Sequence, residues 1–228
     1  EAVEAAGAEA KLSELKTLLQ REGFFDNADQ RPLLFTEFKD TLDYLVDRLR
    51  GWGFRVGCIH GGMKSGSRDE PGTRLHAEQQ FREGEIQVLV ATEAAGEGIN
   101  LQVCNILFNY DIPWNPNRLE QRMGRIHRIG QKNEVFIVNL VATDTREGAV
   151  LAALLNKMDE MRQGLGSDRV FDLVGDLLDD HEISLSDLII SCITNRRRLQ
   201  DVVSSIEQAV SRQHQPSLIA ARDEGLAR

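Results

Sequence analysis

The sequence predicts an α/β fold in three layers, a parallel sheet with helices on both faces, followed by a helical C-terminal extension. Three observations lead to this prediction. Short runs between Leu33 and Val141 are apolar at successive positions, which is typical of parallel strands buried on both faces. Segments of roughly ten residues with apolar side chains at helical spacing separate these runs. Glycine and proline lie at several of the junctions.

The first half of the chain is predicted to alternate between helices and buried strands. Leu12, Leu15 and Leu19 recur at steps of three and four, which predicts a helix whose apolar stripe packs on another element. An apolar run follows Pro32, and glycines at 51 and 53 end the next helix. The expected elements are a helix over 9–20, a strand over 33–36, a helix over 39–50, a strand over 54–59, a loop over 61–73 and a helix over 74–82. The loop is rich in Gly, Ser, Asp and Pro, and we expect it to be mobile.

The second half is predicted to complete the sheet and then to become helical. Its expected elements are strands over 87–91, 105–110 and 135–141, and helices over 145–163, over 170–178 and from Ser186 onwards. We expect the helix over 145–163 to close the sheet unit, and we expect the apolar seam of the last helix to pack back on it rather than to dock another protein. The predicted organisation is an N-terminal helix and linker (1–30), a sheet lobe (31–163) and a helical extension (164–228).

The composition excludes several classes of protein. Hydrophobic residues make up 41% of the 228 residues and charged residues 28%, which excludes collagen-like and wholly disordered chains. Three widely spaced cysteines fit neither a disulfide framework nor a zinc site, so we expect a reducing compartment and no metal ligands. The sequence predicts no membrane span and no secretory signal, which favours the cytoplasm. It begins with Glu1 rather than methionine, and we expect it to be part of a longer protein.

The charge is negative overall but positive in one segment. The chain has 27 Lys and Arg residues against 36 Asp and Glu residues, a net charge of −9, which argues against a surface coated with phosphate-binding charge. Between Ile112 and Asn133, however, five basic residues accompany a single acidic one. A solvated helix face would show the same run, and we interpret Arg196–Arg198 on the last helix in that way.

The basic segment contains residue types suited to binding phosphate. Arg125 and Arg128 are three residues apart, so on a helix they project from one face, which Gln121 joins. Two guanidinium groups aimed at one point clamp a phosphate, because their planar forks match its oxygens. A structural arginine pair normally has carboxylates at matching spacing, whereas only Glu120 lies in reach, one residue off the face. We therefore interpret Arg125 and Arg128 as phosphate ligands.

The segment from Gln121 to Gln131 resembles motif VI of superfamily-two helicases. Its lead-in, Asp111-Ile112-Pro113-Trp114-Asn115-Pro116, and its Arg-Ile-Gly-Gln ending resemble the SWI/SNF-type DNA translocases. Leu119-Glu120-Gln121-Arg122 is similar to the bacterial RapA-like subgroup, although His127 stands where that subgroup has an aspartate. The resemblance implies a RecA-like lobe, and it favours a bacterial, nucleoid-associated protein, or a nuclear one in a eukaryote.

Other segments resemble further motifs of the same family in the order that the family requires. Leu34-Phe35-Thr36 resembles motif IV, His60-Gly61-Gly62 with Arg74 resembles the adjoining nucleic-acid-contacting segment, and Val90 to Leu101 resembles motif V. The glycines at 96 and 98 allow a close approach of the backbone to a ligand.

The resemblance implies a role for each of these residues. Those expected to contact the backbone of double-stranded DNA are Thr36, Gly61, Arg74 and Thr92. Those expected at the nucleotide are Gly98, Asn100, Arg125 and Arg128, with the two arginines as catalytic fingers on the terminal phosphates of ATP beside Gln121. Contacts to DNA phosphates carry no sequence information, so binding is expected to be independent of base sequence and to weaken with salt.

The sequence lacks the motifs that hold the phosphates and the metal ion of ATP. A P-loop requires Gly-x-x-x-x-Gly-Lys-Ser/Thr, but the Lys64-Ser65 pair follows Met63. No apolar strand ends in an acidic pair that would bind Mg²⁺. We therefore expect this chain to be inactive as an ATPase alone, and to act beside an N-terminal RecA-like lobe of the same protein, which binds ATP with Mg²⁺.

Two other functions fit part of the pattern. A former helicase lobe can persist as a non-enzymatic nucleic-acid-binding or protein-docking module, but the intact Gln121, Arg125 and Arg128 argue against lost activity. A P-loop upstream in the parent reading frame would decide for the enzyme. An RNA helicase lobe is the other alternative, and the Trp114-Asn115-Pro116 lead-in favours the DNA translocases instead. Comparing the stimulation of ATPase activity by duplex DNA, single strands and RNA separates these two.

Overall fold

The structure is a computed structural model that divides the chain into two compact units. It describes residues 2–93, 101, 103–113, 116–126, 133–142 and 145–165, together with the single positions 192, 194, 201 and 204. One unit, the sheet unit, comprises residues 1–113 and 121–142, and the other comprises residues 114–120 and 143–228.

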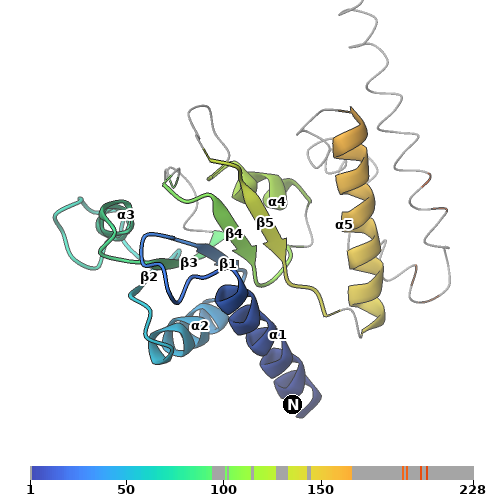
Figure 1. The fold of residues 1–228 in the computed structure, drawn as a ribbon, viewed down its shortest axis with the longest axis horizontal. Coiled ribbons are helices and arrows are strands. Elements are labelled where there is room, and N and C mark those ends of the chain that lie inside the picture. Colours follow the sequence, from blue (N-terminus) through green and yellow to red (C-terminus); the bar gives the residue numbers. More distant parts are fainter. Residues whose placement is uncertain are drawn as a thin grey trace, which may run out of the picture. The chain divides into compact units, whose positions relative to one another are not determined.

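The sheet unit is built on five parallel strands in the order β2-β3-β1-β4-β5 (Figure 1). The strands are β1 (Leu33–Thr36), β2 (Val56–Ile59), β3 (Val88–Thr92), β4 (Ile106–Asn109) and β5 (Phe136–Asn139). Three helices of this unit are α1 (Ala2–Arg21), α2 (Lys39–Gly51) and α3 (Arg74–Glu83), and the short α4 (Pro116–Met123) ends in it. Each predicted strand is present: β1 has the predicted bounds, β3 is shifted by one residue, and β2, β4 and β5 are shorter by one or two residues at an end. The α/β prediction is confirmed.

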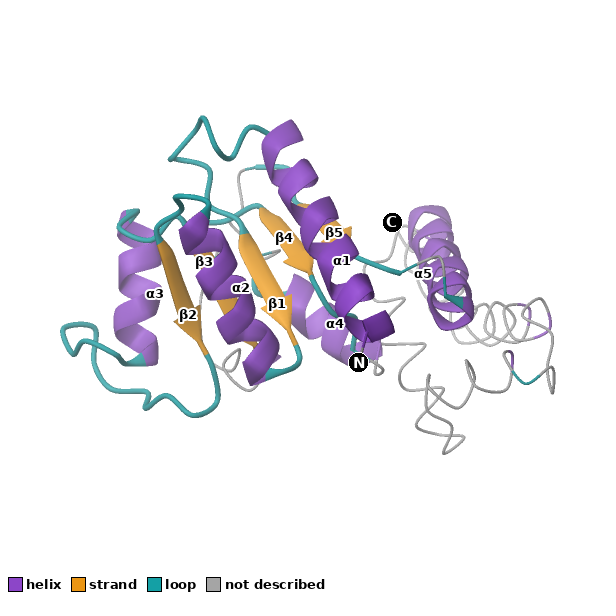
Figure 2. Cartoon of the chain, turned by 90° about the horizontal axis from the view of Figure 1, so that it is seen from below, coloured by secondary structure: helices purple, strands orange, loops and turns teal. Residues whose placement is uncertain are grey.

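Helices cover both faces of this sheet, which gives the three layers that the sequence predicts. Figure 2 shows α1 and α2 on one face and α3 behind the other. Successive residues of the central strand β1 point to opposite faces: Leu34 packs in the cluster under α1 and α2, whereas Leu33 and Phe35 pack in the cluster under α3. All three are at most 1% exposed, which explains why the run is apolar at every position.

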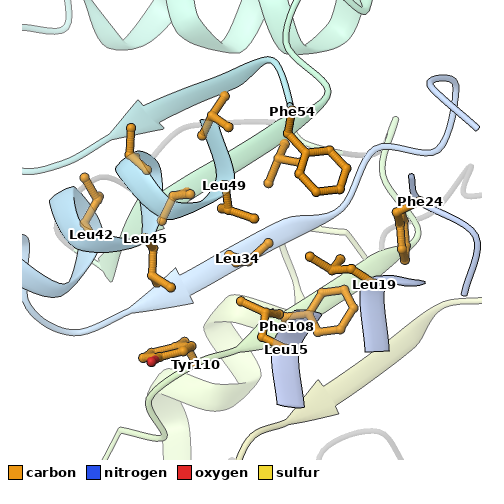
Figure 3. Close-up of a cluster of buried hydrophobic side chains, with 14 of the residues drawn as sticks. Leu15, Leu19, Phe24, Leu34, Leu42, Leu45, Leu49, Phe54, Phe108 and Tyr110 are labelled. Atoms are coloured by element: carbon orange, nitrogen blue, oxygen red, sulfur yellow. The ribbon is translucent and has the colours of Figure 1, made fainter. Parts of the chain in front are cut away.

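The N-terminal helix α1 is part of the core of the sheet unit. Leu15, Leu19 and Phe24 are fully buried in the cluster that contains Leu34 and Phe108 (Figure 3). The predicted apolar stripe therefore packs on the sheet, and the helix itself begins earlier than predicted, at Ala2.

The loop over 61–73 is tied down by hydrogen bonds, whereas its composition predicts mobility. The Thr73 hydroxyl lies 2.9 Å from the carbonyl oxygen of Ser67 and 2.8 Å from that of Glu70, and accepts from the backbone N–H of His76 at the start of α3. Gly66 has φ +57°, and a Cβ atom there would lie 2.2 Å from the Thr73 side chain. These contacts hold the loop against the first turn of α3.

The second unit contains helix α5 (Arg146–Leu165), which agrees with the predicted helix over 145–163. The Thr145 hydroxyl accepts the backbone N–H of Gly148, and this N-terminal cap explains where the helix begins. Leu154, Leu155 and Met158 are buried. The predicted helices over 170–178 and from Ser186, and Arg196–Arg198, lie outside the described residues. In the part that the structure describes, no helix combines the length and apolar character of a membrane span.

Burial sets the reactivity of the two cysteines of the sheet unit. Burial raises the pKa of the Cys104 thiol to about 12 and also raises the pKa of Cys58, which is partly buried. Because the thiolate is the nucleophile, iodoacetamide at about pH 8 is expected to label Cys58 slowly and Cys104 hardly at all in the folded chain. Labelling of Cys58 should accelerate as the pH rises, and both should react in denaturant. Mass spectrometry of the labelled peptides measures this; fast labelling of folded Cys104 would contradict the burial.

Candidate functional site

The candidate site lies along one edge of the sheet. Because all five strands are parallel, their carboxyl ends meet at this edge, which we call the carboxyl edge. The residues that end the strands or directly follow them there include Thr36, His60, Thr92, Asn109 and Asn139. Ligands of open parallel sheets bind outside such an edge.

The two predicted DNA-contacting threonines lie side by side at the carboxyl edge. Thr36 and Thr92 are register partners at the ends of β1 and β3. Their side chains are buried, and the Thr36 hydroxyl donates a hydrogen bond to the carboxylate of Asp111, which follows β4. The Thr36 hydroxyl must therefore break its hydrogen bond to Asp111 before it can donate to a phosphate. The DNA-contacting role of both residues stays a prediction.

The structure also brings together the predicted Gly61 and Arg74. The Arg74 guanidinium donates to the carbonyl oxygen of Gly61 at 2.8 Å and to that of Met63 at 2.9 Å. These bonds fix the start of the loop against the first residue of α3. Nearby, His60 accepts the backbone N–H of Gly62 on its Nδ1 atom, and burial together with Lys39 lowers the pKa of this imidazole.

The predicted motif VI residues are placed differently from expectation. Helix α4 ends at Met123, so Arg125 follows the helix in a turn, and the expectation that the helix continues from Gln121 to Arg125 is wrong. The face shared with Arg128 stays a prediction. The turn forms because the backbone N–H of Arg125 bonds the Arg122 carbonyl, three residues back, at 3.1 Å. The Gln121 side chain is exposed and that of Arg125 is partly exposed. Arg128, Gly98 and Asn100 lie outside the described residues, so their roles stay predictions.

The centre of the carboxyl edge is a buried arginine that we did not predict as a site residue. Arg122 is 2% exposed, and its guanidinium donates to the Asn109 side chain at 2.9 Å and to the Asp111 carbonyl at 2.7 Å. It also forms an ion pair with Glu93 at 2.7 Å and lies over the ring of Phe35, 5.2 Å from the centroid. We call these five residues the Arg122 cluster.

Electrostatics keeps this arginine charged in spite of its burial. The pKa of Arg122 is lowered, mainly by burial, and the carboxylate of Glu93 offsets part of this lowering. Guanidinium groups retain their proton in proteins, so the cluster contains a buried cation held by charge-assisted hydrogen bonds. Its Nε atom is buried and has no hydrogen-bond partner among the described residues.

Two further contacts connect the Arg122 cluster to its surroundings. Asn109 donates to the side chain of Asn139 at the end of β5, at 2.8 Å. From α1, Lys11 donates to the Tyr110 carbonyl at 3.2 Å and lies 3.9 Å from the Asp111 carboxylate. Four strand ends and two helices therefore contribute side chains to one polar network.

The sequence contained one signal for Arg122. Leu119, Arg122 and Ile126 recur at steps of three and four, and all three are buried, so the arginine occupies a position on the apolar side of α4 and the turn after it. Its carboxylate partner, Glu93, lies 29 residues earlier in the chain. A search for carboxylates at helical spacing finds only Glu120 and misses this pair.

No cluster of three or more His, Cys, Asp or Glu side chains that would hold a metal ion occurs within the described ranges.

Comparisons with known proteins identify relatives of this chain. Residues 10–130 match the model of the helicase conserved C-terminal domain. An uncharacterized ATP-dependent helicase of Bacillus subtilis, YqhH, is 43% identical over 148 residues, which are 65% of this chain and 25% of that protein. The RNA polymerase-associated protein RapA of Vibrio cholerae is 40% identical over 100 residues, which are 44% of this chain and 10% of that protein. The transcription regulatory protein SNF2 of Saccharomyces cerevisiae is 33% identical over 129 residues, which are 57% of this chain and 7% of that protein.

A solved structure agrees with these relatives. The C-terminal part of the Fun30 ATPase domain superposes with a TM-score of 0.52 at 28% identity, and the match covers 60% of this chain and 42% of that one. The chain spans a quarter or less of the length of the three relatives named above.

Proposed function

The chain belongs to the helicase conserved C-terminal domain family, as a C-terminal lobe of the SWI/SNF type, and from this we propose that it is the second motor lobe of an ATP-dependent DNA translocase. In the proposal the lobe supplies arginine fingers and DNA-backbone contacts. A first RecA-like lobe of the same protein holds ATP with Mg²⁺ and is needed for activity.

One observation carries the proposal: residues of motifs that lie far apart in sequence gather at one edge of the sheet. Thr36, Thr92 and the Gly61–Arg74 pair lie at the ends of neighbouring strands, within the segment that matches the helicase family. Gln121 and Arg125 lie on either side of Arg122, which contacts the ends of β3 and β4. An edge with both sets of groups is suited to hold a DNA strand and a nucleotide together.

The proposed mechanism uses the arginines only when the two lobes close. ATP, when bound to the first lobe, supplies the terminal phosphate whose cleavage drives the cycle. Arg125 and Arg128 are proposed to donate charge-assisted hydrogen bonds to that phosphate in the closed state and to lose them after hydrolysis. Because the guanidinium groups stabilise charge that develops in the transition state, their effect falls on turnover more than on ATP affinity.

The DNA contacts are proposed to be made to phosphates and to be insensitive to base sequence. Arg74 is the charged member of the predicted set, and Thr36, Gly61 and Thr92 add backbone or hydroxyl groups at the same edge. The relatives include a nuclear protein of yeast and an RNA polymerase-associated protein of bacteria. We accordingly propose that the chain works on double-stranded DNA, at the bacterial nucleoid or, in a eukaryote, in the nucleus.

Duplex binding tests the proposal directly. Arg74 is the charged member of the predicted set, and neutralisation of one phosphate predicts that the Kd rises about 3.5-fold between roughly 50 and 200 mM salt, because a counterion is released on binding. Arg74→Ala is expected to lower the slope of log K against log salt by about one, with equal affinity for unrelated sequences. Fluorescence anisotropy with labelled duplexes measures both quantities.

The matched control is Arg82→Ala, because Arg82 lies in the last turn of the same helix, at the opposite end from Arg74. This variant should keep the wild-type slope. A Kd that does not change with salt, or binding to RNA in preference to duplex DNA, would contradict the proposed function. ATP turnover by this chain alone would contradict the proposed need for a first lobe.

A further inference from the structure

We infer that Arg122 is a positioning residue that couples the DNA-contacting segments of this lobe to the segment that carries Gln121 and Arg125; the inference rests on the proposed function. The bonds of Arg122 reach two other chain segments. Glu93 directly follows Thr92 and precedes the glycine-rich segment, whereas Asn109 and Asp111 lie at the end of β4. Arg122 therefore joins the end of α4 to the ends of β3 and β4.

The connection extends to the first predicted DNA contact. Asp111 offers its carbonyl oxygen to Arg122 and its carboxylate to the Thr36 hydroxyl and to Lys11 of α1. Only one residue separates Thr36 or Thr92 from Arg122 in this network. A DNA strand that displaces either threonine is therefore expected to displace Arg122 as well. Gln121 and Arg125 are one and three residues away from Arg122 along the chain, and the backbone N–H of Arg125 bonds the Arg122 carbonyl.

The chemistry of the Arg122 cluster argues for more than packing. A buried ion pair is expensive to desolvate, and apolar residues of similar volume commonly give equal or greater stability. Here the surroundings include the apolar Phe35 ring, and the buried Nε lacks a partner among the described residues. A methionine of similar length would fill this space. Methionine cannot, however, donate hydrogen bonds to Glu93, Asn109 and Asp111. The hydrogen bonds of Arg122 fix the segments of these residues relative to its own segment.

The inference is tested in the protein that carries both lobes. The measured quantity is the stimulation ratio, ATP turnover at saturating duplex DNA divided by turnover without DNA. The double variant Arg122→Met with Glu93→Gln removes both charges and keeps the volume, and its ratio is expected to fall at least tenfold. Arg122→Lys keeps the positive charge but lacks the planar guanidinium group that donates to several acceptors at once, and its stimulation ratio should fall as well. If the double variant does not fold, Arg122→Lys decides.

The control separates coupling from stability. Leu49→Ala removes a fully buried side chain of α2, in the cluster on the other face of the sheet from Phe35. This variant should lose stability and keep the wild-type stimulation ratio. A folded Arg122 variant with an unchanged ratio would overturn the inference, as would an equal loss in Leu49→Ala. An absence of DNA stimulation in the wild-type protein would instead overturn the proposed function.

A second measurement uses this chain alone and does not depend on ATP. Amide hydrogen exchange is followed in peptides that cover β3 with Glu93 and, for comparison, the helix α2. The Arg122 variants are expected to speed exchange at least tenfold in the first peptide and not in the second. Equal acceleration in both peptides, or none in the first, would show that Arg122 does not position this segment.

Discussion

Replacing Arg125 or Arg128 with alanine is expected to reduce DNA-stimulated ATP turnover by about 10³-fold or more in the protein that carries both lobes. An arginine finger in other nucleotide hydrolases contributes about 10³ to 10⁵ in rate, because it stabilises charge that forms on the transferring phosphoryl group. The expected change in ATP affinity is small, since the first lobe is proposed to hold most of the nucleotide. Turnover is measured at saturating duplex DNA, and ATP affinity with a fluorescent analogue.

Arg82→Ala is the matched control for these variants. Arg82 lies in the last turn of α3, near the amino ends of the strands, where Arg31 at the start of β1 donates to its carbonyl oxygen. Its removal breaks an ion pair with Glu78, 3.7 Å apart, away from the carboxyl edge, and should leave DNA-stimulated turnover within about twofold. Near-normal turnover in both Arg125→Ala and Arg128→Ala would remove the finger assignment while leaving the family membership intact.

The second large effect is expected on stability, from Arg122→Ala. This substitution leaves the carboxylate of Glu93 and the oxygens of Asn109 and Asp111 without their buried donor. Removing one partner of a buried ion pair typically costs about 3–5 kcal/mol in the free energy of unfolding. Urea denaturation followed by circular dichroism measures the loss for this chain.

Two comparisons test the physical cause of that loss. Arg122→Met together with Glu93→Gln removes both charges, so it should be clearly more stable than Arg122→Ala. Lys39→Ala breaks an exposed pair with Asp43, 2.7 Å apart, and should leave the midpoint of unfolding unchanged within error. If the double variant is as unstable as Arg122→Ala, the lost stability comes from the hydrogen bonds to Asn109 and Asp111, which both variants lack, rather than from an unpaired charge.

Local sequence patterns were sufficient to predict the elements of the sheet unit. The spacing of leucines predicts α1 and α2, and apolar runs predict β1 and β3, because helix and strand periodicities are properties of neighbouring residues. The threonine that caps α3 and the glycine that ends it also act within a few residues. The end of α4 also has a local signal that we did not use, because Gly124 directly follows its last residue, Met123. The turn there depends on the buried contacts of Arg122 and Ile126.

The sequence by itself determined the order of the strands and helices along the chain, the apolar faces that form the core, and the resemblance to a helicase lobe. Tertiary structure alone decided which residues meet at the carboxyl edge: Thr36 with Asp111, Gly61 with Arg74, and Arg122 with Glu93. The physical reason is distance along the chain, because these partners lie between 13 and 75 residues apart. The spacing of neighbouring residues does not predict contacts between such distant partners. They form because the parallel sheet brings the carboxyl ends of its strands to one edge.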